Sequence, residues 1–72
     1  MIIVSQKKMN IINFENVNLI GANADGEIKV RLGVNDCTLL GKYKTVERAE
    51  EVLRDIIHWY DIGARRYNMP EE

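Results

Sequence analysis

The sequence predicts an α+β fold, in which about five short antiparallel strands form a meander or a curled roll that is packed by one C-terminal helix. Three observations lead to this prediction. Short runs of β-branched and aromatic side chains, separated by polar turns, fill residues 1–44. Residues 46–60 instead repeat apolar side chains with the spacing of an amphipathic helix. The chain has 72 residues, so a single domain is expected over residues 1–72.

The first three strands are expected in the N-terminal part of the chain. They are rich in Ile, Val or Phe and lie at residues 2–5, 10–14 and 17–22. The dipeptide Asp25-Gly26 follows, and this pair tolerates the positive φ angles of a tight turn. A hairpin tip is therefore expected at residues 23–26.

The fourth strand, residues 27–32, shows the clearest alternation in the chain. Apolar side chains occupy every second position, at Ile28, Val30 and Leu32. Charged side chains occupy the positions between them. Because successive side chains of a strand point to opposite faces, this pattern predicts one buried face and one charged face exposed to water.

The fifth strand is expected at residues 37–43, after a turn marked by Asn35 and Asp36. Steps of two from Cys37 place Leu39 and Tyr43 on the same inner face. Cys37, the only cysteine, is therefore expected to be a buried free thiol that packs as a small hydrophobic side chain.

The helix is expected to begin after Thr45, because a threonine hydroxyl is a good N-cap. Glu47 in the first turn complements the helix dipole. Gly63 is expected either to end the helix or to lie inside a helix that continues to Tyr67. The expected apolar face consists of Val46, Ala49, Val52, Leu53, Ile56, Ile57 and Tyr60.

Neither an enzyme nor a metal or cofactor site is expected from this composition. A Cys–His nucleophile pair needs hydrogen-bond contact, whereas Cys37 is expected inside a strand and His58 on the outer face of the helix. A structural zinc site needs about four Cys or His ligands, and the sequence contains one of each. No glycine-rich phosphate-binding motif occurs.

Charge and hydropathy limit the expected partners and location. The net charge of −1 makes nucleic acid an unlikely partner, and no apolar run approaches the roughly 20 residues of a membrane-spanning helix. The lone cysteine and the lack of a signal segment predict a cytoplasmic protein. Because so short a chain has a small core, a homo-oligomer is expected.

The end of the helix carries the candidate ligand or interface residues. These are Trp59, Ile62, Arg65, Arg66 and Tyr67. Trp, Tyr and Arg dominate interface energetics, and an aromatic plane with Arg donors also suits a nucleotide-type ligand. In the simpler interpretation, Tyr60 and Tyr67 belong to the core, and both arginines are solvated and pair with Asp61. The main alternative is a dimer interface built on Trp59 and Ile62.

A second candidate is a basic patch on the strands. It consists of Lys29, Arg31, Lys42 and Lys44. If the fourth and fifth strands are neighbours, these side chains share one outer face, which would suit a phosphate-bearing partner. An ordinary solvated sheet face is the simpler interpretation.

Residues 11–17 (IINFENV) and 40–53 (LGKYKTVERAEEVL) contain a strand, a helix cap and a helix face. In these motifs the chain resembles a set of short, mostly uncharacterised proteins of Gram-positive bacteria, their phages and other mobile elements. The resemblance covers most of the chain and supports the fold. It implies no catalytic residues.

An origin in a phage or mobile element, which the resemblance implies, favours a small accessory protein that acts stoichiometrically. The first hypothesis is therefore a non-enzymatic binding protein of a phage or mobile element, which acts on a host defence protein or sequesters a nucleotide-type signal. The alternative is a structural, self-associating interaction module with no small-molecule ligand.

Overall fold

The computed structural model describes residues 1–34 and 36–72, so the Asn35 position of the expected turn lies outside the described residues. The α+β class is confirmed, with six described strands in two three-stranded sheets and one α-helix. The elements are β1 (Ile2–Val4), β2 (Ile11–Asn13), the 3-10 turn η1 (Phe14–Asn16), β3 (Leu19–Ala22), β4 (Glu27–Arg31), β5 (Cys37–Lys42), α1 (Val46–Asp61) and β6 (Arg66–Asn68).

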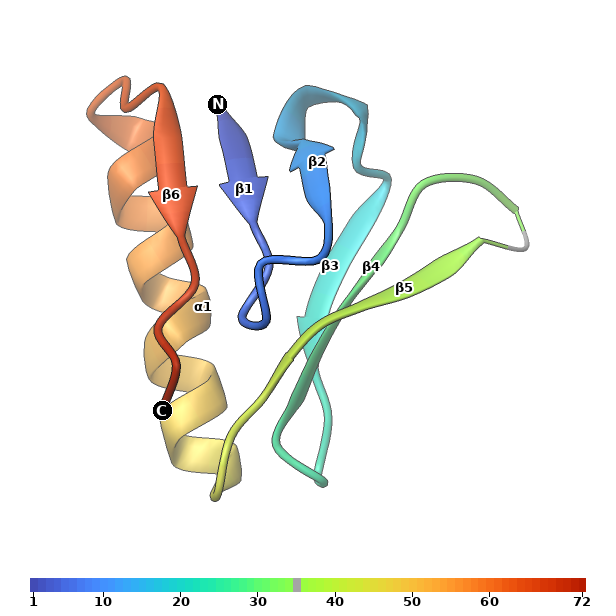
Figure 1. The fold of residues 1–72 in the computed structure, drawn as a ribbon, viewed down its shortest axis with the longest axis vertical. Helices are drawn as coiled ribbons and strands as arrows, with labels where there is room; N and C mark the ends of the chain where they lie inside the picture. Colours follow the sequence, from blue (N-terminus) through green and yellow to red (C-terminus); the bar gives the residue numbers. More distant parts are fainter. Residues whose placement is uncertain (35) are drawn as a thin grey trace.

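The first sheet has the strand order β2-β1-β6 and is mixed (Figure 1). β1 pairs with β2 antiparallel and with β6 parallel. The prediction of purely antiparallel strands was therefore wrong. Because β6 has three residues and its partner β1 lies at the other end of the chain, no local pattern predicted this strand.

The second sheet has the strand order β3-β4-β5 and is antiparallel throughout. The expected hairpin at residues 23–26 connects β3 to β4. There the side-chain oxygen of Asn23 accepts hydrogen bonds from the amides of Asp25 and Glu27. Gly26 adopts a φ of 79°, which favours glycine.

The helix begins and ends with local signals. The hydroxyl of Thr45 accepts a hydrogen bond from the amide of Arg48 at 3.1 Å, as expected of an N-cap. At the other end Gly63 has a φ of 81°, and the amide of Ala64 donates to the carbonyl of Trp59. This Schellman arrangement ends the helix before Gly63, so the alternative of a helix that continues to Tyr67 was wrong. No helix in the described part of the chain is long and apolar enough to cross a membrane.

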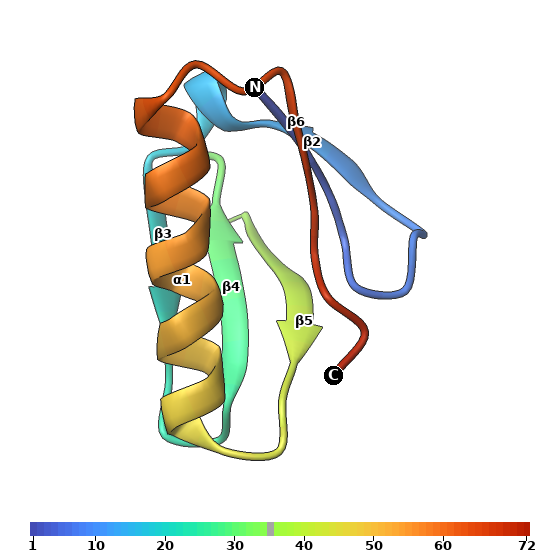
Figure 2. The same cartoon turned by 90° about the vertical axis from the view of Figure 1, so that its left-hand side faces the viewer.

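The core lies between the helix and the two sheets (Figure 2). α1 packs along β3 and β4. The β2-β1-β6 sheet lies on the side of β5 that faces away from the helix. The core side chains come from all three parts: Ile3, Ile12, Ile28, Val30, Leu40, Tyr43, Ala49, Val52, Ile56, Tyr67 and Met69. Each sheet thus buries one face against the same core.

An irregularity in β5 changes which of its side chains are buried. Ile28 is in register with Gly41, whereas Lys29 is in register with Leu39, so the bulge leaves Leu40 as an extra residue. Leu40 and Gly41 are both buried. The prediction of an inward-facing Cys37 and Leu39 was wrong, because both are exposed.

The buried stripe of the helix is narrower than the sequence predicted. Ala49, Val52 and Ile56 are fully buried. Ile57 and Tyr60, which were expected on the apolar face, are about half exposed, at 52% and 43%. Apolar surface is therefore left open along this flank of the helix.

Candidate functional site

Gln6 joins the tip of the β1–β2 hairpin to the C-terminal end of strand β5. Its backbone amide donates to the carbonyl of Leu40 at 2.8 Å. Its side-chain amide accepts from the backbone N–H of Lys42 at 2.7 Å and donates to the Lys42 carbonyl at 2.9 Å. The same side-chain nitrogen donates to the carbonyl of Glu71 at 2.7 Å. These four bonds fix the position of the hairpin tip against the second sheet.

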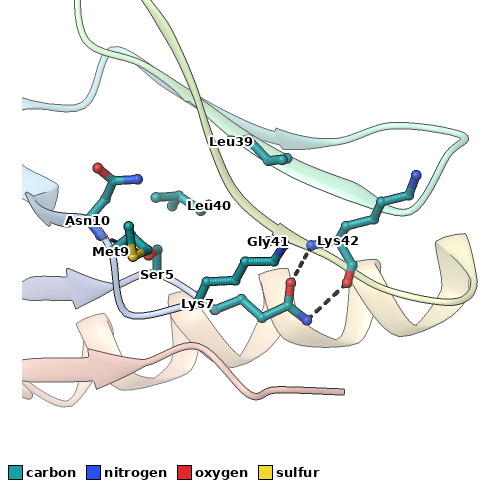
Figure 3. A pocket seen from close by; sticks show the side chains of 9 residues that line it. Ser5, Lys7, Met9, Asn10, Leu39, Leu40, Gly41 and Lys42 are labelled. Carbon is teal, nitrogen blue, oxygen red and sulfur yellow. Dashed lines mark hydrogen bonds between the residues drawn. The ribbon is translucent and has the colours of Figure 1, made fainter.

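A hollow of about 310 Å³ lies beside this junction (Figure 3). Its walls come from the hairpin tip and from β5, where the side chains of Met9, Leu39 and Leu40 supply apolar surface. Met9 is 81% exposed and Leu39 45% exposed. Lys7 and Lys42 are also among the lining residues, and the Lys42 side chain extends from its main chain away from Met9 and Leu40. The hollow is therefore apolar inside and cationic at its margin.

The edge of β5 next to this hollow has unpaired main-chain groups. The backbone N–H of Leu32 donates to the carbonyl of Asp36, so these two residues form a hydrogen-bonded pair of the β4–β5 ladder. Hydrogen-bonded and non-hydrogen-bonded pairs alternate in an antiparallel ladder, so Val30 and Thr38 form the next hydrogen-bonded pair. The N–H and C=O of Leu39, and likewise those of Cys37, therefore point away from β4. In the described residues no main-chain or side-chain group bonds to them. Gln6 covers only the other end of this edge.

Three of the four residues of the expected basic patch lie on β4 and β5. β4 and β5 are neighbours, and Lys29, Arg31 and Lys42 are all exposed on them. Lys44 is exposed as well, but it lies after the end of β5, in the connection to the helix. The structure therefore brings three of the four residues onto one sheet.

Glu27 interrupts the positive charge of this patch. Its carboxylate lies 3.6 Å from the ammonium of Lys29, and Lys42 is its partner in the β4–β5 register. The pKa of Glu27 is lowered first by the hydrogen bond from the Asn23 side-chain amide and then by the charges of Lys29 and Lys42. A phosphate at this face would have to compete with a carboxylate that is already in place.

The residues expected at the helix end are separated by the structure. Trp59 and Ile62 are exposed, at 42% and 60%, and Arg65 and Arg66 are exposed after the Gly63 turn. Trp59 contacts the ring of His58 edge-on, with 5.5 Å between the ring centroids. Tyr67 is only 6% exposed and belongs to the core, as the simpler interpretation held, whereas Tyr60, which that interpretation also placed in the core, is 43% exposed.

Tyr67 is buried because it is the central residue of β6, between two exposed neighbours. Its hydroxyl donates to the carboxylate of Asp55 on the helix at 3.3 Å. Burial and then the nearby Asp55 charge raise the pKa of Tyr67 above its usual range. The side chain thus joins β6 to the helix and is not accessible to a ligand.

Arg65 lines a shallow hollow of about 480 Å³ at the end of the helix, together with Tyr60 and Glu15. The Glu15 carboxylate in this hollow accepts a hydrogen bond from the N-terminal ammonium of Met1 at 2.8 Å. Trp59 and Arg66 line none of the five hollows described. Of the five residues expected at the helix end, only Arg65 therefore lines a hollow, where the neighbouring aromatic ring is that of Tyr60.

A second apolar surface lies on the opposite part of the molecule, between the helix and β3. Tyr60 packs on Phe14 in a T-shaped arrangement with 5.1 Å between ring centroids. Both rings line a hollow with Leu19, which is 58% exposed. Ile57 lies one helical turn before Tyr60 and is 52% exposed. β3 is an edge strand, so this surface borders on an open sheet edge.

Comparisons with protein-family models, with curated proteins and with solved structures found no match to this chain. Function therefore has to be inferred from the residues and their arrangement. In the described residues no group of three His, Cys, Asp or Glu side chains is placed to hold a metal ion.

Sequence reasoning missed the hollow beside Gln6. Gln6, Lys7 and Met9 occupy a polar turn, and nothing in their local pattern indicates a contact with β5. One signal was available, since Met9 is a large apolar residue inside a charged turn. A residue of this kind is either packed against another segment or exposed for binding.

Proposed function

We propose that this protein acts by binding another protein in a fixed stoichiometry, without catalysis, as a small accessory factor of a phage or mobile element. The observation that supports this most directly is the amount of exposed apolar surface. Ten large apolar side chains of the described residues are exposed, from Leu32 at 39% to Val34 at 90%. Two pairs of them line a common hollow, Leu19 with Tyr60 and Met9 with Leu39, and grouped apolar surface of this kind is typical of protein interaction sites.

The arrangement of the helix end favours a protein over a nucleotide-type signal. A nucleotide site combines an aromatic plane with cationic donors around one cavity. Here Tyr67 is buried, and neither Trp59 nor Arg66 lines any of the hollows described. Trp59 and Ile62 remain as exposed apolar contacts, which suit a protein surface.

The identity of the partner follows only from the resemblance described above. It points to a host protein in the bacterial cytoplasm, with a defence protein as the main candidate. The lone cysteine fits a reducing compartment.

Native mass spectrometry of the protein purified from its host tests this proposal. The expected result is a complex with a second polypeptide at a fixed ratio and without a bound nucleotide. A retained nucleotide, or a chain that stays free at all concentrations, would contradict it.

Thermal melting with cyclic and linear nucleotides gives an independent check on the nucleotide alternative. A ligand at a hundredfold its dissociation constant stabilises the folded state by about 2.7 kcal/mol, so binding would raise the melting temperature clearly. We expect no shift. The double variant Arg65→Ala/Arg66→Ala identifies any nucleotide shift that arises at the helix end.

A second candidate function, self-association, is favoured by the apolar surface at β3. Leu19, Ile57 and Tyr60 are exposed beside an open strand edge, as in proteins that pair through sheet edges. Sedimentation of the wild type and of Leu19→Ser/Ile57→Ser tests it. Val34→Ser is the control, because Val34 is exposed and lines none of the hollows described. Dimers that are lost only in the double variant would support this candidate.

A further inference from the structure

We infer that the open edge of β5 binds an extended acidic segment of the partner protein as an additional strand. The inference rests on the proposed function, because it specifies how that partner is bound. Three features of the structure carry it: the unpaired main-chain groups of β5, the apolar hollow beside them and the lysines that line the hollow.

The main chain of β5 can form hydrogen bonds with one more strand. The N–H and C=O groups of Cys37 and Leu39 point away from β4 and have no partner in the described residues. Where the same edge continues, Gln6 already bonds to Leu40 and Lys42 as an additional strand would. An extended peptide would continue this pairing along the open half of the edge.

The hollow beside this edge gives the added strand a place for a side chain. It measures about 310 Å³ and has apolar walls from Met9, Leu39 and Leu40. Alternate side chains of a strand point to the same face, so one apolar residue of the peptide would enter the hollow while its neighbours stay outside. Main-chain pairing then supplies affinity, and the hollow supplies selectivity.

The charges around the hollow select an acidic segment. Lys7 and Lys42 line it, and no carboxylate of the described residues does. Arg31 lies exposed on the adjoining strand β4, where Lys29 is already paired with the Glu27 carboxylate. A second copy of this chain fits less well, because a symmetric pairing of two such edges would bring the same lysines together.

A displayed library of random peptides of about ten residues is the probe for this site. We expect the enriched peptides to alternate apolar and polar residues and to carry acidic residues toward one end. Binding should weaken by about tenfold when Lys7→Glu and Lys42→Glu are combined, and it should weaken as salt is raised. A library that yields no binder, or binders without acidic residues, would overturn the inference.

Two further measurements locate the bound peptide. In the isotope-labelled wild type, an enriched peptide should slow the exchange of the Cys37 and Leu39 amides. Cys37→Pro removes one edge donor at a position where β4 is not bonded, so it should abolish binding, whereas Cys37→Ala retains that donor, leaves the lining of the hollow unchanged and should keep most of it. Slowed exchange at the helix end, or a chain that dimerises through β5, would contradict the inference.

These results separate this inference from the proposed function. A partner found by native mass spectrometry that leaves the Cys37 and Leu39 amides unprotected would overturn the strand-addition inference alone. The absence of any polypeptide partner would overturn the proposed function.

Discussion

The side-chain amide of Gln6 pairs with the main chain of Lys42 as a peptide group of a neighbouring strand would. Both bonds are short, at 2.7 and 2.9 Å, and they run in opposite directions between the two residues. A third bond, to the Glu71 carbonyl, ties the segment after β6 to the same point. One side chain thus connects the β1–β2 hairpin, β5 and the C-terminal segment.

Replacing Gln6 tests this junction. Gln6→Ala removes three hydrogen bonds and leaves the amide and carbonyl of Lys42 to water, so we expect a loss of about 1–2 kcal/mol in the free energy of unfolding. Urea denaturation measures it. Lys7→Ala is the matched control in the same turn and should change the stability by less than about 0.5 kcal/mol. Equal stabilities of the two variants would show that the junction contributes nothing.

Gly26 and Gly63 both have positive φ angles but should respond differently to substitution. A Cβ at Gly26 would meet the carbonyl oxygen of Tyr43, whereas a Cβ at Gly63 meets nothing within 4 Å. Gly63→Ala should cost about 1 kcal/mol from backbone conformation alone. Gly26→Ala should cost clearly more, because backbone atoms must also move. Gly21→Ala serves as the control, since that glycine has neither constraint. Equal losses in the first two variants would contradict this account.

The raised pKa values of two buried tyrosines predict a lower free energy of unfolding at high pH. Burial raises the pKa of Tyr43 to about 12, and burial with the Asp55 charge raises the pKa of Tyr67 above its usual range. Below about pH 10, the pKa of tyrosine in the unfolded chain, both hydroxyls stay protonated in the folded and in the unfolded protein. Above it the unfolded chain releases its protons first, so the free energy of unfolding falls by up to about 1.4 kcal/mol per pH unit for each tyrosine.

Denaturation midpoints measured between about pH 9 and pH 12 check this slope. Tyr43→Phe should reduce it, because one of the two raised groups is gone. The Tyr43 hydroxyl also donates to the carbonyl of Pro70 at 2.8 Å, so the variant is expected to be slightly less stable at neutral pH. An unchanged slope in the variant would contradict the assignment.

Cys37 should be accessible in the folded protein. Its side chain is exposed at the start of β5. A disulfide reagent that reports the released thiolate should react with the native chain within about tenfold of its rate with the denatured chain. Reaction that begins only after denaturation would show that the thiol is buried.

The parts of the fold that were predicted correctly depend on neighbouring residues. Thr45 caps the first turn of its own helix, and Gly26 closes a hairpin between adjacent strands. Strand β4 alternates over five residues, so the burial of Ile28 and Val30 could be read directly, whereas Leu32, expected on the same face, lies after the strand and is exposed. In each case the residues that decide the structure lie within a few positions of one another.

The parts that were missed depend on contacts between distant segments. The bulge near Leu40 reverses the side-chain alternation of β5, so the count from Cys37 gave the wrong face. β6 has one apolar residue, Tyr67, and forms only because β1 offers it an edge. The candidate site changed for the same reason, because burial of Tyr67 divides the expected helix-end cluster.

Hydrogen exchange of the Cys37 and Leu39 amides, in the free protein and in the complex with its native partner, tests the central claim most directly. We predict fast exchange of both amides in the free protein and marked protection in the complex. Protection of the helix end around Trp59 and Arg66, with both β5 amides still exchanging fast, would contradict it.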